Sequence, residues 1–205
     1  MYVKVTDGSL RFAERTVFHG IHAQFVSGEV SAIVGPSGSG KSSLLACIAG
    51  ELELSTGTLE IATGSSTEPP DPTNVAWVPQ GSNALGPRSA MDNVMIGPLA
   101  EGSDPSTAAQ LARDALHRVG LSSVAHQRAR TLSGGELQRL AFARALSTNR
   151  PIILADEPSA SLDAKNTHAL ADLLAALRPT GIVIVATHDP ILIESASRVL
   201  DLRRA

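Results

Sequence analysis

Aromatic residues make up only 3% of the 205-residue sequence, and cysteine occurs once, at Cys47. A single cysteine excludes an internal disulfide framework and suits a reducing compartment. The sequence also has no run of 18 apolar residues, the length that a membrane-spanning helix needs. A basic segment followed by an apolar stretch is missing from the N-terminus. We therefore expect the chain itself to be cytoplasmic.

A basic excess is likewise absent. The 17 lysine and arginine residues are outnumbered by 20 aspartate and glutamate residues, which gives a formal net charge of −3. Proteins that bind nucleic acid neutralise its phosphates with a basic surface, so we expect no nucleic-acid partner. With 43% hydrophobic residues, the chain is long enough to bury one sizeable core. The sequence therefore predicts one domain that spans residues 1–205.

Short apolar runs rich in β-branched residues alternate with helical patterns. The four runs are residues 30–34, 75–78, 152–155 and 182–186. Such runs are typical of parallel strands that helices cover on both faces. The helical patterns occupy residues 106–119, 137–146 and 164–177. We therefore predict an α/β fold with a mostly parallel core sheet.

Three segments depart from this alternation. In the first 30 residues, polar residues and turn signals separate the apolar positions, which favours an N-terminal antiparallel β layer. Residues 63–74 combine prolines with small polar residues and are predicted to form a loop. Boundaries near Gln80 and Thr131 enclose a mainly helical insert. We therefore expect residues 81–130, with the helix that follows Thr131, to form a helical subdomain.

A glycine-rich loop stands between the run 30–34 and an apolar helix. It comprises Gly35, Pro36, Ser37, Gly38, Ser39, Gly40, Lys41 and Ser42, and Ser43 begins the helix. The glycines allow successive N–H groups to point inward and bind an anion at a helix N-terminus. In this P-loop pattern, Lys41 reaches the β- and γ-phosphates of a nucleotide and the Ser42 hydroxyl binds Mg²⁺. A flexible Ser/Gly linker is the alternative, but a linker would not be bracketed by an apolar strand and helix.

Two carboxylates follow the apolar run 152–155, and Pro158 ends it. Ligands of open α/β sheets bind at the carboxyl ends of strands, so Asp156 is a candidate Mg²⁺ ligand. Glu157 is a candidate base that accepts a proton from, or orients, an attacking water. His188 follows the run 182–186 and is a candidate hydrogen-bond donor to the γ-phosphate or the water. Solvated acidic residues at a strand end, and a surface or capping histidine, are the alternatives.

The segment before the helix 137–146 carries a resemblance to a known family. It reads Leu132, Ser133, Gly134, Gly135 and Glu136. This is similar to the LSGGQ-type signature of ABC ATPases, with Glu136 in the fifth position. Physically, Ser133 and the two glycine N–H groups form a second anion site at a helix N-terminus. Ser133 and Glu136 also satisfy the capping box of an ordinary helix, and both interpretations can hold.

The rest of the family's pattern follows in order. Gln80 resembles the Q-loop residue, which implies a role in catalysis and in Mg²⁺ binding. Ser161 and Asp163 lie in a segment that resembles the D-loop, and His188 resembles the switch histidine. Phe12 resembles the aromatic residue that stacks on adenine. The alternatives are that Tyr2, also upstream of the loop, has this role, or that Phe12 is a core residue.

The resemblance implies a P-loop NTPase that binds and hydrolyses ATP with Mg²⁺. It implies a homodimer, or a heterodimer with a similar subunit, in which the signature of one chain completes the ATP site of the other. It also implies an integral membrane permease as partner, which would hold the chain on the inner face of the membrane. The size and the run ending in Asp156 and Glu157 are most similar to the lipoprotein-releasing, macrolide-exporting and cell-division group. Residues 81–97 and 126–131 depart from that group.

Three other functions fit parts of the pattern. A soluble ABC protein that acts on nucleic acid or translation usually carries two nucleotide domains or a long coiled coil, and the sequence has neither. A P-loop kinase needs an acceptor pocket and a lid, whereas the signature and Glu157 fit water as the acceptor. A regulatory or mechanotransducing ABC ATPase that moves no solute has the same residues, so this alternative stays open.

Overall fold

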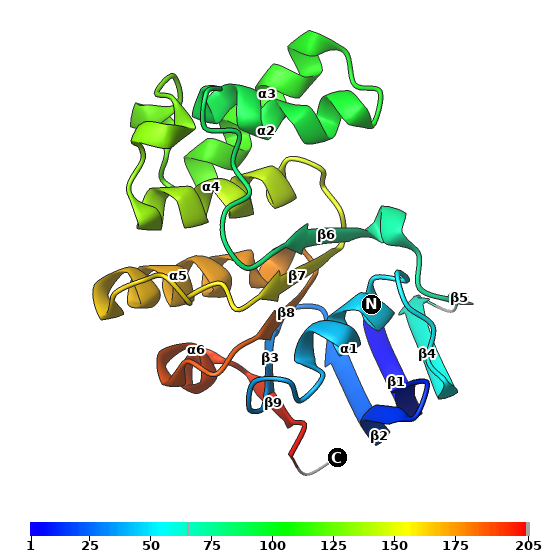
Figure 1. The fold of residues 1–205 in the computed structure, drawn as a ribbon. Coiled ribbons are helices and arrows are strands. Elements are labelled where there is room, and N and C mark those ends of the chain that lie inside the picture. The colour runs from blue at the N-terminus through cyan, green and yellow to red at the C-terminus, as the bar shows by residue number, and fades with distance from the viewer. Residues whose placement is uncertain (65, 204–205) are drawn as a thin grey trace.

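The computed structural model describes residues 1–64 and 66–203. A four-stranded antiparallel sheet and a five-stranded sheet lie next to each other, and helices cover the larger sheet (Figure 1). The smaller sheet has the order β2-β1-β4-β5. Its strands are β1 (Tyr2–Phe12), β2 (Arg15–Val26), β4 (Thr56–Thr63) and β5 (Ser66–Glu68). The predicted antiparallel β layer is therefore confirmed, and it extends beyond the first 30 residues.

The larger sheet has the order β6-β7-β8-β3-β9, and every pairing between its described strands is parallel. Its strands are β3 (Val30–Val34), β6 (Val75–Val78), β7 (Ile152–Asp156), β8 (Ile182–Ala186) and β9 (Arg198–Asp201). Successive side chains point to opposite faces. On β7, Ile152 and Leu154 pack on the side of the β layer, whereas Ile153 and Ala155 pack on the side of the helices. The sheet is thus apolar on both faces, as the predicted mostly parallel core requires.

Different helices cover the two faces. Helix α1 (Lys41–Ile48) packs between the larger sheet and the β layer, in one hydrophobic core. Helices α4 (Gly134–Leu146) and α5 (Ala164–Leu177) belong to the second core on the opposite face. Helix α6 (Pro190–Ser195) and the 3₁₀ turn η4 (Arg178–Thr180) complete this side. The predicted helix 164–177 has the same bounds as α5, and the one predicted at 137–146 begins three residues earlier, at Gly134.

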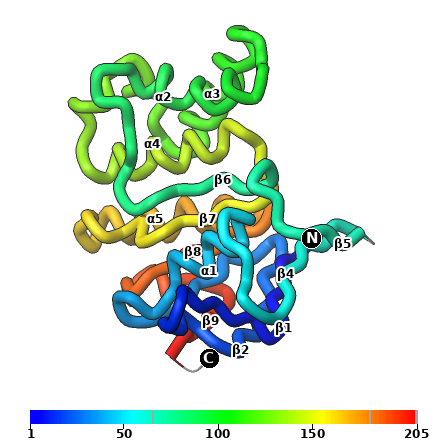
Figure 2. Tube along the Cα trace, turned by 45° about the vertical axis from the view of Figure 1, so that its right-hand side comes forward, coloured from blue at the N-terminus to red at the C-terminus, as the bar shows by residue number. Residues whose placement is uncertain are grey.

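Helices α2 (Ala90–Ala100) and α3 (Pro105–Arg118) lie beyond α4, on the far side of the larger sheet from the β layer (Figures 1 and 2). The Ser89 and Asp92 side chains form a capping box at the start of α2. Asp104 caps α3 by accepting N–H bonds from Ser106 and Thr107. The 3₁₀ turns η2 (Ser122–Val124) and η3 (Ala129–Thr131) connect α3 to α4. Residues 90–131 thus form a helical region, although the exact limits 81–130 of the subdomain stay a prediction.

The predicted loop at residues 63–74 is wrong in part. Ser66–Glu68 form strand β5, which pairs with β4 through Ile61↔Glu68, and Pro72–Asn74 form the 3₁₀ turn η1. Gly64 has a φ of 63° and allows the chain to reverse between the two strands. The prolines begin only at Pro69, so they do not prevent this pairing.

In the part of the chain that the structure describes, no helix combines the length and apolarity that crossing a membrane requires.

Candidate active site

The largest cluster of predicted site residues surrounds a cavity of about 620 Å³ at the carboxyl end of the larger sheet. The loop between β3 and α1 lines one wall together with the first turn of α1, through residues 36–38 and 40–43. Gln80, Glu157 and His188 contribute from the segments that follow β6, β7 and β8. The β1–β2 hairpin closes the remaining side. Chain segments that are distant in the sequence therefore meet in one cavity because the parallel strands end at the same edge.

The conformation of the glycine-rich loop requires a glycine at position 40. Gly40 has a φ of 94°, and a Cβ atom there would lie 2.7 Å from Val17 Cγ1 and 3.0 Å from Phe18 Cδ1. A side chain at this position would therefore meet both backbone strain and a steric clash. Gly40 is also the N-cap of α1, and no described side chain caps this helix end. Helix N-terminal N–H groups that lack a capping side chain favour an anionic ligand.

Lys41 occupies the centre of the site and is almost fully buried, with 7% of its side chain exposed. Its Nζ atom donates hydrogen bonds to the carbonyl oxygens of Gly35 and Pro36, at 2.9 and 3.3 Å. It also lies 3.2 Å from Glu157 Oε1. A buried charge is tolerated only when it is paired and hydrogen-bonded. The loop carbonyls and Glu157 together meet that condition for Lys41.

Glu157 joins Lys41 to His188. While Oε1 contacts Lys41, Oε2 lies 2.8 Å from His188 Nδ1. The Glu157 backbone has a φ of 43°, in the left-handed region that is uncommon for residues other than glycine. Strained backbone conformations of this kind cluster at functional sites. The strand β7 therefore ends with a sharp change of direction that brings the Glu157 carboxylate between Lys41 and His188.

Asp156 is the last residue of β7, directly before Glu157. Its Oδ1 atom is buried and has no hydrogen-bond partner among the described residues. A buried carboxylate oxygen without a donor is costly unless a cation or a water satisfies it. Ser42 and Gln80 line the cavity, whereas Asp156 is not among the described residues that line it. The Ser42 hydroxyl, the Gln80 amide oxygen and the Asp156 carboxylate are all oxygen donors, the kind that suits Mg²⁺.

Phe12 lies at the cavity with 51% of its surface exposed. Tyr2, the other aromatic residue considered for adenine, is not among the described residues that line the cavity. The cavity also contains Arg15 and Val17, which sequence reasoning missed. The sequence does show Arg15 and Val17 two residues apart and close to Phe12. This spacing indicates a shared site only once the β1–β2 hairpin is known to pack on the glycine-rich loop.

The predicted signature lies elsewhere. Leu132 is buried in the core, and residues 133–136 do not line the described cavity of the same chain. Ser133 is the N-cap of α4, and its Oγ accepts a bond from the Glu136 N–H at 3.3 Å. The Glu136 carboxylate accepts bonds from the Ser133 N–H and hydroxyl, each at 2.8 Å, and these bonds lower the pKa of Glu136. The capping box expected as an alternative is therefore present.

The signature glycines touch the segment that contains Ser161 and Asp163. A Cβ atom at Gly135 would lie 2.4 Å from Asn166 Oδ1, and one at Gly134 would lie 4.0 Å from the Ser161 carbonyl oxygen. Asp163 caps α5 by accepting a bond from the Asn166 N–H. The start of α4 and the start of α5 thus form one surface that is separate from the cavity.

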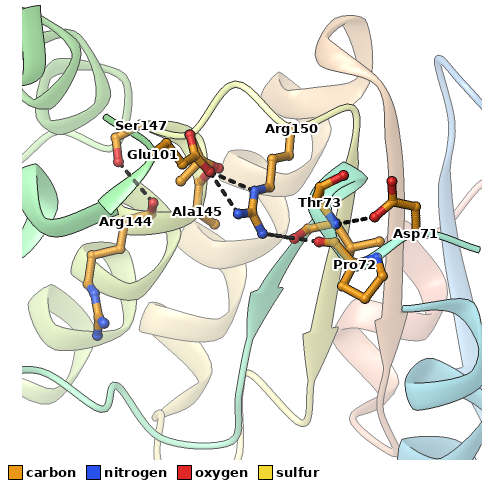
Figure 3. Close-up of polar contacts among 10 residues, drawn as sticks. Asp71, Pro72, Thr73, Glu101, Arg144, Ala145, Ser147 and Arg150 are labelled. Atoms are coloured by element: carbon orange, nitrogen blue, oxygen red, sulfur yellow. Dashed lines mark hydrogen bonds and ion pairs between the residues drawn. The ribbon is translucent and has the colours of Figure 1, made fainter. Parts of the chain in front are cut away.

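A second cavity, of about 580 Å³, is lined by residues of α2, α4 and β6. Arg150 lines this groove and is held on two sides (Figure 3). Its guanidinium contacts Glu101 Oε1 through Nε at 2.9 Å and Nη2 at 2.7 Å, and its Nη1 donates to the carbonyl oxygens of Pro72 and Val75. Arg144 points away from this cluster in Figure 3 and donates to the Asn83 carbonyl oxygen at 2.8 Å. Arg150 therefore ties the end of α2 to the start of β6.

Comparison with known proteins places these features in a family. Residues 18–160 match the family model described as ABC transporter. The chain is 38% identical over 200 residues to the lipoprotein-releasing system ATP-binding protein LolD of Anaeromyxobacter dehalogenans, covering 91% of this chain and 82% of that protein. It is also 38% identical over 199 residues to the macrolide export ATP-binding/permease protein MacB of Nitrosomonas europaea, covering 93% of this chain. The chain spans only 30% of that longer relative.

The fold matches solved structures as well. A dimeric ATP-binding cassette in a post-hydrolysis state, bound to ADP and Pi, superposes with a TM-score of 0.80 at 29% identity. The match covers 97% of this chain and 93% of that one.

Proposed function

Because the chain belongs to the ABC transporter family and is an ATP-binding, ATP-hydrolysing subunit, we propose that it works as a dimer that encloses two ATP molecules. The contact of Glu157 with both Lys41 and His188 carries the proposed hydrolytic site, since it joins a phosphate-binding lysine, a candidate base and a candidate donor. The proposed role of each residue follows from its place around the cavity.

In the proposed complex, the loop Gly35–Ser43 binds the phosphates through its backbone N–H groups, and Lys41 moves from Glu157 to the γ-phosphate. Phosphate oxygens replace the Glu157 carboxylate as the counter-charge of Lys41, so the buried cation stays paired. Ser42, Gln80 and the Asp156 oxygen that lacks a partner among the described residues would hold Mg²⁺, which would neutralise charge on the phosphates. Phe12 supplies an exposed aromatic face for the base.

For hydrolysis, Glu157 orients the attacking water and accepts its proton once Lys41 has left the carboxylate. Gln80 helps to position this water. His188 stays within reach of Glu157 and donates a hydrogen bond towards the γ-phosphate. This order of events makes the base available only after ATP has drawn Lys41 away from the Glu157 carboxylate.

The dimer follows from the separation of the two surfaces in one chain. Residues 133–136 do not line the described cavity of their own chain, but they present a helix N-terminus that suits a phosphate. In the proposed dimer, the Ser133 hydroxyl and the N–H groups of Gly134 and Gly135 contact the ATP held by the partner's loop. Ser161 and Asp163 lie beside them, near the second chain. The dimeric relative bound to ADP and Pi supports this arrangement, for a homodimer or for two similar subunits.

We further propose that an integral membrane permease docks in the groove between α2, α4 and β6. Trp77 and Ile96 give the groove an apolar surface, while Arg144 and Glu51 supply charges of both signs. Such a mixture suits a short amphipathic segment of a partner. The MacB relative supports a permease, because its name joins an ATP-binding and a permease function in one chain. This partner would hold the subunit on the cytoplasmic face of the membrane.

The substitution Glu157→Gln tests the proposed site. The amide cannot accept the proton of water, so we expect ATP turnover to fall by about 100-fold or more, while ATP binding is retained. ATP should then trap a dimer, which size-exclusion chromatography with and without ATP measures. Asp172→Asn, at an exposed position of α5 away from the cavity, is the matched control. Undiminished hydrolysis by Glu157→Gln would show that another residue is the base.

A further inference from the structure

The β1–β2 hairpin contributes Arg15 as well as Phe12 and Val17 to the nucleotide cavity. Phe12 and Arg15 are directly opposite each other in the register of the two strands. Residues opposed in this way in an antiparallel pair place their side chains on the same face, with Cβ atoms about 4.5–5.5 Å apart. An aromatic ring and a guanidinium, both planar, therefore stand side by side at the cavity.

The Arg15 guanidinium differs from the other cation of the cavity in its contacts. Among the described residues, no hydrogen bond or ion pair involves its side chain, whereas Lys41 is bonded to two loop carbonyls and to Glu157. A guanidinium is more weakly hydrated than an ammonium, and it stacks readily on flat π systems such as nucleic acid bases. Arg15 can therefore contact a ligand without breaking an interaction within the described part of the chain.

The strand geometry places Arg15 away from the phosphate loop. Val17 and Phe18 are the residues of β2 that lie nearest to Gly40 of the loop. Arg15 lies two residues before Val17, across the shift in the β1–β2 register between Leu10 and Arg11, and both residues line the cavity. Two residues of extended strand span about 6.6 Å. This offset puts Arg15 beside Phe12, at the end of the cavity where the base would lie when the loop holds the phosphates.

We propose that Arg15 is a nucleotide-binding residue whose guanidinium stacks on the adenine base beside Phe12. The proposal rests on the proposed nucleotide site, and it adds a second member to the surface that receives the base. Phe12 and Arg15 together offer a wider planar contact than the ring alone.

ADP binding by isothermal titration calorimetry tests this role, with Arg15→Ala, Arg15→Lys and the wild-type protein. Loss of the stacking contact should weaken ADP binding by about three- to tenfold. Arg15→Lys keeps the charge but loses the planar group, so it should behave as Arg15→Ala does. Arg11→Ala is the matched control, because Arg11 is an exposed arginine of the same hairpin that does not line the described cavity.

Inorganic tripolyphosphate separates base contacts from phosphate contacts. Tripolyphosphate has no base, so its Kd should be the same for wild type and Arg15→Ala. This Kd is measured by the displacement of a bound fluorescent ADP analogue. If Arg15→Lys restores ADP binding and tripolyphosphate is weakened by Arg15→Ala, Arg15 pairs with phosphates and the stacking proposal is wrong. Wild-type affinity of Arg15→Ala for ADP would also overturn it. Failure of the wild-type protein to bind ADP would instead contradict the nucleotide site itself.

Discussion

The two halves of the proposed composite site differ in how far their polar groups are already satisfied. In the phosphate-loop half, Lys41 is buried and paired, and Glu157 is held between Lys41 and His188. In the signature half, Ser133 and Gly134 are exposed, and the polar contacts described for Ser133 are those of the capping box with Glu136. The first half is therefore assembled within one chain, whereas the second presents an exposed helix N-terminus, which we propose meets a partner.

This difference has a structural origin. The phosphate-loop half lies where the ends of β3, β7 and β8 converge, and the β1–β2 hairpin packs on it through Val17. The signature half lies at the junction of α4 and α5, where Gly135 meets Asn166. Substitutions in the first half should thus affect an isolated subunit, and those in the second should affect association.

The largest expected effect is that of Gly40→Ala on the isolated subunit. The new Cβ atom would meet Val17 and Phe18 in a left-handed backbone conformation, so the free energy of unfolding should fall by about 3 kcal/mol. Chemical denaturation without nucleotide measures this. Gly38→Ala is the control, because Gly38 also has a positive φ but no described atom lies within 4 Å of the position that a Cβ would take there; it should cost only about 1 kcal/mol. Equal losses of unfolding free energy for Gly40→Ala and Gly38→Ala would show that the contact of Val17 with Gly40 does not hold the hairpin on the loop.

Ser133→Arg should have the next largest effect, and this effect is on dimer association; loss of the α4 N-cap should in addition lower the free energy of unfolding of the isolated chain by about 1 kcal/mol. A long cation at the N-terminus of α4 opposes the helix dipole and fills the space proposed for the partner's phosphates. ATP-dependent association in a Glu157→Gln background should weaken by about 100-fold. Analytical ultracentrifugation with ATP measures it, and Ser122→Arg, at an exposed site remote from the signature, is the control. A tenfold loss of ATP affinity in the monomer would place Ser133 in the site of its own chain and remove the contrast between the halves.

The smallest expected effect is that of Glu136→Gln. Glutamine retains the capping geometry but accepts weaker hydrogen bonds than a carboxylate, so unfolding should become easier by less than about 1 kcal/mol at neutral pH. The bonds from Ser133 lower the pKa of Glu136 in the folded chain. Its stabilising effect is therefore present above the ordinary glutamate pKa and disappears as the pH falls through the lowered value. The free energies of unfolding of wild type and Glu136→Gln, measured between pH 7 and pH 3, should converge as the pH falls. A difference that stays constant would show that the Glu136 carboxylate is not its cause.

Local patterns predicted most of the fold. The apolar runs became β3, β6, β7 and β8 because a strand buried on both faces needs apolar residues throughout, and few other segments have them. Helix α5 was predicted in full because the Asp163 cap and the apolar periodicity mark the same bounds. Residues 63–74 were predicted less well, since pairing of Ser66–Glu68 with β4 depends on an open strand edge that composition does not reveal.

The sequence by itself determined the chemistry of the site, because a glycine-rich loop ending in Lys41 and Ser42, and a strand ending in Asp156 and Glu157, need particular residue types at adjacent positions. Tertiary structure alone decided which groups meet. The ion pair of Lys41 with Glu157, and the position of Arg15 beside Phe12 at the cavity, depend on how separate strands converge and how the hairpin docks on Gly40. Those contacts join residues without any fixed spacing, so no local pattern specifies them.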